Sequence, residues 1–457
     1  MAASPAPVGG MSDTRGWAGH PRGLSTLFFT EMWERFSYYG MRAFLILYMT
    51  APAAAGGLGF DRPLAGSVYG TYTGSVWLTP IIGGFIADRW LGAYRSVLIG
   101  GMIIAAGHFV LAFKALASFY LGLGLIVIGT GLLKPNATTM LGMLYDERDA
   151  RRDAGFSLFY MGINVGAFSG PLVAGALAQK VDWHLGFACA GVGMTLGLIQ
   201  YVLGRDRLRP AADRAAARAL MVAPPFAAST AAAVRVNDRR LLGLTAAEWA
   251  RVGAVFVFFA FAAIFWAAYE QAASTLNLFA DTSVARRVFG WTVPTSWFVS
   301  IQAIFVILLA APFAWLWVRL GPREPSTPTK FAFGLLFAGV SFVLLLPAGG
   351  AAQQGALVSG WWLVAAYFLQ VVGELCLSPV GNSVVTKLAP PRIVGLMMGV
   401  WFLAIAAGNK IAGWVAGLSG SVPVTRIFLG IAIVTIGSAV ALFFLIKPVQ
   451  RLMGGVR

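Results

Sequence analysis

Twelve runs of apolar residues, most of them longer than twenty residues, divide this chain. The hydrocarbon core of a bilayer is about 30 Å thick, and a helix of about 20 apolar residues crosses it. Glycine, proline and charged residues separate the runs, as is typical of connections between helices. The pattern therefore predicts an all-α membrane protein with twelve transmembrane helices. The expected spans are residues 24–50, 66–87, 94–114, 117–142, 153–178, 184–204, 248–280, 293–320, 330–347, 358–388, 393–418 and 423–447.

The composition agrees with this class. The chain is 58% hydrophobic and 11% charged, with a mean hydropathy of +0.75, whereas soluble domains are about 45–50% apolar and about 25% charged. A net charge of +16 would suit a nucleic acid, but the basic residues lie in short loops between apolar runs. That distribution is the one expected of a membrane protein with a basic cytoplasmic side. We therefore expect a lipid bilayer around the chain and no nucleic acid as a partner.

The sequence predicts no metal centre, no disulfide and no cleaved leader. Cys189 and Cys376 lie within apolar runs, and the three histidines are scattered along the chain. Neither pattern has the spacing of a metal site or a disulfide framework. Residues 1–23 are rich in Ala, Pro and Gly and lack the apolar core of a signal peptide, so we expect an uncleaved cytoplasmic tail.

The segment 205–247 interrupts the apolar pattern and contains eight arginines and two adjacent prolines. We interpret it as a cytoplasmic linker, with a short amphipathic helix near 211–221, between six-helix bundles at 24–204 and 248–447. We expect residues 448–457 to form a cytoplasmic C-terminal tail. An even number of spans on each side of the linker puts both termini on the same face. The basic loops identify that face as cytoplasmic, and we expect the membrane to be a bacterial inner membrane.

The first span carries two glutamates and two arginines, although the run around them is long enough to cross the bilayer. Each charge near a bilayer centre costs at least about 2.5–3.5 kcal/mol on insertion scales. These groups therefore need partners within the protein, and their presence points to a function. On a helix, one stripe collects Glu31, Arg35, Tyr38 or Tyr39, and Arg42. Such a stripe has to face a watery, protein-lined interior, which favours a transport pathway.

The same residues carry a resemblance. The run Glu31-Met-Trp-Glu34-Arg35-Phe-Ser-Tyr38-Tyr39-Gly40 resembles the ExxERFxYYG motif of the proton-dependent oligopeptide transporters, a branch of the major facilitator superfamily. The resemblance implies the major facilitator fold and import of di- and tripeptides together with protons. The proton gradient would drive transport without a cofactor. Many bacterial relatives have two additional helices between the halves, but this linker has no second apolar run, so we expect twelve helices.

Further segments resemble motifs of that family in other spans. Their residues are Gly83-Gly84-Phe-Ile-Ala-Asp88-Arg89 after span 2, Gly129-Thr-Gly131-Leu-Leu-Lys134-Pro135-Asn136 in span 4, Phe159-Tyr160-Met-Gly-Ile-Asn164 in span 5, Phe265-Trp266-Ala-Ala-Tyr269-Glu270-Gln271 in span 7 and Gly373-Glu374-Leu-Cys-Leu-Ser378-Pro379 in span 10. The resemblance assigns Asp88 and Arg89 to gating. It assigns Glu31, Glu34, Arg35 and Glu270 to proton coupling, with Glu270 expected as a buried, unpaired carboxylate that takes up a proton.

The expected substrate site has two charged ends. Arg35, Arg42 and Lys134 from the first half would bind a carboxylate, while Asn164, Gln302 and Glu374 would bind an amino group. The remaining residues expected to line the site are Tyr38, Tyr39, Tyr72, Trp77, Trp266, Ser378 and Trp401. A cavity that is positive on one wall and negative on the other suits a zwitterion, and a short peptide is one.

Several residues allow a second interpretation. Lys134 could belong to a structural salt bridge, Asn164 to an interhelical hydrogen bond and Trp401 to core packing. The sequence departs from the family where Trp77 replaces a frequent tyrosine, Gln302 a frequent asparagine and Asn382 a frequent aliphatic residue. The role of Lys410, another charge in span 11, stays open.

Three other functions compete with peptide import. Members of the family move nitrate and other anions, but Glu374 and Asn164 favour a ligand with an amine. An intramembrane hydrolase would need a nucleophile and base, and the chain has neither HExxH nor GxSxG. A nutrient receptor without flux would be expected to carry a signalling domain. We therefore expect a monomeric transporter rather than an enzyme.

Overall fold

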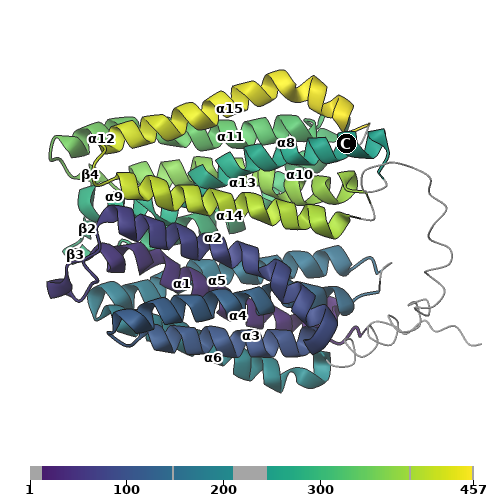
Figure 1. The fold of residues 1–457 in the computed structure, drawn as a ribbon, viewed down its shortest axis with the longest axis horizontal. Coiled ribbons are helices and arrows are strands. Elements are labelled where there is room, and N and C mark those ends of the chain that lie inside the picture. The colour runs from purple at the N-terminus through teal and green to yellow at the C-terminus, as the bar shows by residue number, and fades with distance from the viewer. Residues whose placement is uncertain (1–12, 147–148, 209–243, 391–392, 455–457) are drawn as a thin grey trace, which may run out of the picture.

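The computed structural model describes residues 13–146, 149–208, 244–390 and 393–454. Long helices dominate these residues, as Figure 1 shows. In the first part of the chain they are α1 (Gly23–Thr50), α2 (Arg62–Ile86), α3 (Ala93–Leu111), α4 (Leu116–Met143), α5 (Arg152–Lys180) and α6 (Trp183–Leu203). In the second part they are α8 (Ala246–Tyr269), α9 (Thr275–Ser283), α10 (Trp297–Leu320), α11 (Thr327–Leu344), α12 (Leu346–Gln353), α13 (Trp361–Leu388), α14 (Val394–Leu418) and α15 (Val424–Leu452).

Short elements connect the helices. The 3-10 turns are η1 (Trp17–Gly19), η2 (Ala53–Ala55), η5 (Glu270–Ala273) and η6 (Gly321–Arg323), and η3 (Ala87–Leu91) is a π-helical turn. Two-residue strands β1 (Val284–Ala285) and β4 (Val358–Ser359) pair in parallel, while β2 (Arg287–Val288) and β3 (Trp291–Thr292) form an antiparallel hairpin. All four strands lie at the same end of the molecule (Figure 1).

The prediction of an all-α, multi-pass membrane protein is confirmed. Every predicted span overlaps a long helical segment, and ten helices of the described chain are long and apolar enough to cross a membrane. The two long helices outside this set are α1, which carries the four charges, and α2, which is rich in Gly, Thr and Tyr. Their polarity is compatible with a bilayer because they pack against other helices.

One predicted span is wrong as a continuous helix. The run 248–280 is broken by η5, so α8 ends directly before Glu270 and α9 begins after Ser274. Ser274 donates to the backbone oxygen of Glu270, and Thr275 donates to the side chain of Gln271. Such side-chain hydrogen bonds compete with the helical pattern. The break places a carboxylate at a bend rather than within a regular helix.

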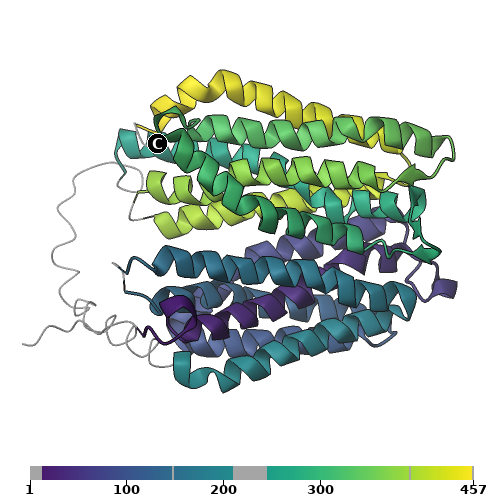
Figure 2. The same ribbon diagram turned by 180° about the vertical axis from the view of Figure 1, so that it is seen from behind.

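The helices form two groups that follow the order of the chain (Figures 1 and 2). Within the first group α1 packs on α5 and α6, and α3 packs on α4; within the second, α11 packs on α13 and α15. The beginning of α1, the end of α6, the beginning of α8 and the end of α15 lie at one end of the molecule, which we call the linker end. The predicted amphipathic helix at 211–221 lies outside the described residues.

The groups meet along a seam between α2 and α14 in which glycines allow backbone contact. A Cβ atom on Gly66 would lie 2.3 Å from the backbone oxygen of Gly413, and one on Gly413 would lie 2.4 Å from that of Gly66. No side chain fits at either position, so glycine is required for this approach. The seam holds the two halves together near the end opposite the linker.

Hydrogen bonds also join the halves at that opposite end. Asn277 donates to the backbone oxygen of Ala43 at 2.7 Å, and Ser300 donates to that of Phe168 at 2.8 Å. Trp297 Nε1 donates to Leu172 at 3.0 Å. These bonds connect α1 with α9 and α5 with α10.

At the linker end, the residues before α1 pack against the connection between α4 and α5. His20 Nδ1 lies 2.8 Å from the Tyr145 hydroxyl, and Arg151 donates to the backbone oxygen of Gly19. Burial at this contact raises the pKa of Tyr145 to about 12. Residues 13–22 of the predicted N-terminal tail are therefore part of the folded structure.

Candidate functional site

A cavity of about 250 Å³ lies between the two halves. Helices α1, α2, α4 and α5 supply one wall, and α8, η5, α10, α13 and α14 supply the other. The predicted site residues that line it are Glu31, Arg35, Tyr39, Arg42, Trp77, Lys134, Asn164, Trp266, Glu270, Gln302, Glu374, Ser378 and Trp401. The fold thus brings together side chains from most of the sequence motifs.

The first wall contains an ion cluster within α1. Arg35 Nε lies 3.1 Å from Glu31 Oε1, and Arg35 also forms an ion pair with Glu34. All three side chains are buried, and Glu34 is fully inaccessible. The expected pairing of Glu31 with the residue four positions later is present, because such residues share a helix face. One guanidinium therefore compensates two carboxylates, so the cluster is net negative when all three groups are charged.

Arg42 joins the two walls. It forms an ion pair with Glu270 of η5, and its Nε donates to the Tyr69 hydroxyl at 2.9 Å. The expectation that Glu270 is unpaired is therefore wrong. The break after α8 turns this carboxylate toward α1, and an ion buried in a membrane protein needs a partner of opposite charge. Tyr69 was not predicted; its position one turn before Tyr72 on α2 was the available signal.

Lys134 has a different environment. Its Nζ lies 3.1 Å from the centroid of the Trp77 ring, and in the described chain it makes neither a hydrogen bond nor a salt bridge. The salt-bridge interpretation of Lys134 therefore has no support in these residues. The Trp77 ring stacks on Phe402 of α14 at a centroid distance of 6.2 Å. The aromatic face can stabilise an ammonium without neutralising it. Glu31 and Glu34 of the net-negative cluster attract Lys134 through space, but they form no ion pair with it in the described residues.

Glu374 lies on the second wall and is held by a neutral group. The Tyr269 hydroxyl donates to Glu374 Oε2 at 2.5 Å. Glu374 is buried, and among the described residues it has no cationic partner. Tyr269 belongs to the segment of span 7 that resembles the family, but it is not among the predicted site residues. Its hydroxyl stabilises the carboxylate without neutralising it.

The two predicted amides are also engaged. Asn164 Nδ2 donates to the backbone oxygen of Tyr160 at 2.9 Å, and Gln302 Nε2 donates to Gln370 Oε1 at 2.9 Å. Tyr160 lines the cavity as well. The bond of Asn164 lies within its own helix, so no contact among the described residues supports the interhelical alternative. Both amides retain an oxygen for a ligand.

Other predicted residues do not line the cavity. Glu34, Tyr38 and Tyr72 are buried behind the first wall, and the Tyr38 ring lies under Arg35 and Arg42 at 5.5 and 5.9 Å. Lys410 is exposed on α14 and donates to the Thr71 hydroxyl of α2 at 2.6 Å.

Asp88 and Arg89 lie in η3 and are exposed. They are separated from the cavity by the last turns of α2 and form no ion pair within the described part of the chain. This location is compatible with gating and excludes direct contact with a ligand in the cavity.

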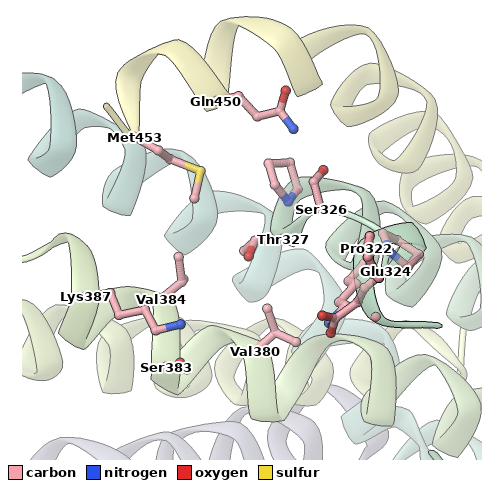
Figure 3. A pocket seen from close by; sticks show the side chains of 14 residues that line it. Pro322, Glu324, Ser326, Thr327, Val380, Ser383, Val384, Lys387, Gln450 and Met453 are labelled. Carbon is pink, nitrogen blue, oxygen red and sulfur yellow. The ribbon is translucent and has the colours of Figure 1, made fainter. Parts of the chain in front are cut away.

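A larger cavity of about 780 Å³ lies elsewhere, at the linker end of the second half (Figure 3). The loop between α10 and α11 and the ends of α13 and α15 enclose it, with Glu324 and Lys387 on opposite sides. Only one half of the molecule contributes to it, and no predicted site residue lines it. The smaller cavity between the halves is therefore the candidate site. The described residues contain no cluster of histidine, cysteine and acidic groups able to hold a metal.

Comparison with known proteins gives a consistent result. A model of the POT family matches residues 94–222 and 243–441. The chain is 42% identical to the uncharacterized transporter YclF of Bacillus subtilis, with 97% of each chain covered. It is 38% identical to the peptide transporter YePEPT of Yersinia enterocolitica, again with 97% of each chain covered. It is 36% identical to a di-/tripeptide transporter of Lactococcus lactis, covering 96% of this chain and 98% of that protein.

Solved structures agree. A mutant of the peptide transporter POT in complex with alafosfalin has a TM-score of 0.86 and 41% identity, covering 97% of this chain and 98% of that one. A POT family transporter in complex with 5-aminolevulinic acid has a TM-score of 0.84 and 32% identity, covering 96% and 98%. The chain therefore has the major facilitator fold and is a membrane transporter rather than an enzyme. It belongs to the POT family, the proton-dependent oligopeptide transporters.

Proposed function

We propose that the protein is a proton-coupled symporter that imports di- and tripeptides by alternating access. The observation that carries this proposal is the polarity of the cavity: among the described residues Lys134 forms no ion pair on one wall, and Glu374 forms none on the other. A ligand with a carboxylate at one end and an ammonium at the other would supply each of these two side chains with a partner of opposite charge. The named peptide transporters among the relatives, and the relative that binds 5-aminolevulinic acid, support a ligand with both groups.

Lys134 is the main group for the substrate carboxylate in this proposal. Arg35 is engaged by two carboxylates of its own helix, and Arg42 is engaged by Glu270. An ammonium that makes no hydrogen bond to an anion gains most from a carboxylate, since charge-assisted hydrogen bonds are the strong ones. Arg35 and Arg42 would join it when their glutamates are protonated.

Glu374, Gln302 and Asn164 would bind the amino end. Glu374 Oε2 accepts from Tyr269, which leaves Oε1 for the ligand, and both amides have an oxygen available. An ammonium donates three hydrogen bonds and accepts none, so three acceptors suit it. Aromatic and small side chains would line the space for the peptide: Tyr39, Trp77, Trp266, Ser378 and Trp401. Tyr38 and Tyr72 would support this wall from behind.

Proton coupling would run through Glu31, Glu34 and Arg35 together with Glu270. Protonating a glutamate of the α1 cluster removes a negative charge and frees Arg35, so a substrate carboxylate is bound more favourably. Protonating Glu270 breaks its ion pair with Arg42 and loosens the contact between the halves. Proton and peptide then favour each other's binding, as reciprocal coupling requires.

The remaining features of the proposal concern the whole molecule. The bundles 24–204 and 248–447 would rock around the cavity, so that the seam between α2 and α14 opens in the outward-facing state, with Asp88 and Arg89 acting at the linker end. Both termini would be cytoplasmic in a bacterial inner membrane, and the transporter would act as a monomer without a cofactor. Such rocking of two halves is the usual mode of alternating access.

Uptake into proteoliposomes with an imposed pH gradient tests the function. Labelled dialanine and trialanine should accumulate when the outside is acidic, and a protonophore should abolish the accumulation. Binding without accumulation would indicate a receptor and contradict the proposal. Accumulation of nitrate with indifference to peptides would assign the chain to the anion-transporting members.

A further inference from the structure

A chain of buried hydrogen bonds leads from the cavity into the second half. Gln302 of α10 donates to Gln370 of α13 at 2.9 Å, and Gln370 Nε2 donates to Ser341 of α11 at 3.3 Å. The Ser341 hydroxyl lies 2.6 Å from the backbone oxygen of Ala338. Gln370 and Ser341 are inaccessible, whereas Gln302 lines the cavity. Only the first member of this chain can therefore contact a ligand.

The direction of every bond follows from the last one. A backbone carbonyl only accepts, so the single hydrogen of Ser341 is used on Ala338. Ser341 must then accept from Gln370, which turns the amide nitrogen of Gln370 toward α11 and its oxygen toward Gln302. Gln302 must donate to that oxygen. A carbonyl on α11 thus determines the orientation of an amide on α10.

The consequence is that Gln302 presents its oxygen rather than its nitrogen as the free end of the amide. No described residue donates to Gln302 Oε1. On the facing helix, Asn164 uses its nitrogen on Tyr160 and likewise keeps its oxygen. Together with Glu374 these two amide oxygens offer acceptors to the ligand, which suits a ligand end that carries only N–H groups.

We infer that Gln370, oriented by Ser341, is a positioning residue that holds Gln302 Oε1 toward the amino group of the ligand and thereby rejects amino-blocked peptides. This inference rests on the proposed function. Without Gln370 the amide of Gln302 can rotate and offer its N–H group, which suits the carbonyl of an acylated amino end. Discrimination between free and acylated peptides is therefore the property that Gln370 controls.

The test compares dialanine with N-acetyl-dialanine as competitors for uptake of a labelled dipeptide. In Gln370→Leu the affinity for dialanine should fall about tenfold, since one hydrogen bond to a charged group is lost, while that for the acetylated peptide stays within about twofold. Ser341→Ala removes only a hydroxyl and should shift the ratio in the same direction by about threefold. If Gln370→Leu does not reach the membrane, the ratio measured for Ser341→Ala tests the inference instead. Thr195→Val removes a half-buried hydroxyl on α6 of the first half, a helix that does not line the cavity, and should leave the ratio unchanged.

A double-mutant cycle distinguishes positioning from general damage. In a Gln302→Leu background, Gln370→Leu should change the ratio by less than about twofold, because the amide that it orients is absent. Equal losses for both peptides, or full additivity with Gln302→Leu, would overturn the inference. If the unmodified protein does not accumulate peptides, the proposed function fails. Suppose instead that the unmodified protein accumulates peptides and prefers dialanine to N-acetyl-dialanine. If Gln370→Leu then keeps the same preference, only the inference about Gln370 fails.

Discussion

The two walls of the cavity differ in how their buried charges are compensated. On the first wall Arg35 has both of its carboxylate partners on its own helix, whereas Lys134 contacts an aromatic ring and forms no ion pair with a described residue. On the second wall Glu374 is held by the hydroxyl of Tyr269. One wall thus keeps a cation, and the other an anion, that forms no ion pair among the described residues; we call these two charges unmatched.

This difference indicates which groups are structural and which are available to a ligand. A buried charge with a full ionic partner is stabilised in place, and removing the partner is costly. A buried charge held only by neutral groups keeps most of its field and attracts an ion of opposite sign. Arg42 and Glu270 are the exception that links the walls, since each compensates the other across the halves.

The largest effect is expected from breaking the link between the walls. Glu270→Gln removes the proton-accepting group that holds Arg42, so gradient-driven accumulation should fall to background. Peptide counterflow, which needs no net proton movement, should partly survive. Glu34→Gln should behave alike by removing a proton site from the α1 cluster.

Counterflow by correctly folded protein is the decisive measurement for these variants. If folding, binding and counterflow are lost together, the glutamates are structural supports. Normal accumulation driven by pH in Glu34→Gln would exclude that residue from coupling.

The next effect concerns the unmatched cation. Lys134→Met keeps the length of the side chain and removes the charge, so affinity for dialanine should fall about 30-fold, within the range for charge-assisted hydrogen bonds. Dialanine amide, which lacks the carboxylate, should lose less than about threefold. Both affinities are measured by competition of each ligand with the uptake of a labelled dipeptide. An equal loss for the two ligands would show that Lys134 does not contact the carboxylate.

The two walls also differ in how much of them the sequence could predict. The pairing of Glu31 with Arg35 follows from helical spacing alone, and the long spans follow from apolar length. The partners of Arg42 and Gln302 could not be predicted, because Tyr69 and Gln370 are 27 and 68 residues away in the chain. The break at Glu270 depends on local side-chain bonds that leave no proline or glycine signal.

A smaller effect is expected at the unmatched anion. Glu374→Gln keeps the acceptor and the contact with Tyr269 but removes the charge, so free dialanine should bind about tenfold more weakly. N-acetyl-dialanine has no ammonium and should be affected by less than about twofold. Competition assays on the two peptides give the ratio. Equal losses would remove Glu374 from recognition of the amino end.

The smallest effect on binding is expected away from both walls. Asp88 lies exposed in η3, beyond the last turns of α2, and cannot contact a ligand between the halves. Asp88→Asn should slow exchange between inward- and outward-facing states, because the charge is removed where the linker ends of the halves have to rearrange. Equilibrium affinity in detergent should stay within about threefold, equivalent to about 0.6 kcal/mol. Counterflow rates and binding isotherms on the same preparation separate the two quantities. A large loss of affinity in folded protein would place Asp88 in contact with the cavity and remove the distinction between the charged walls and the gating end.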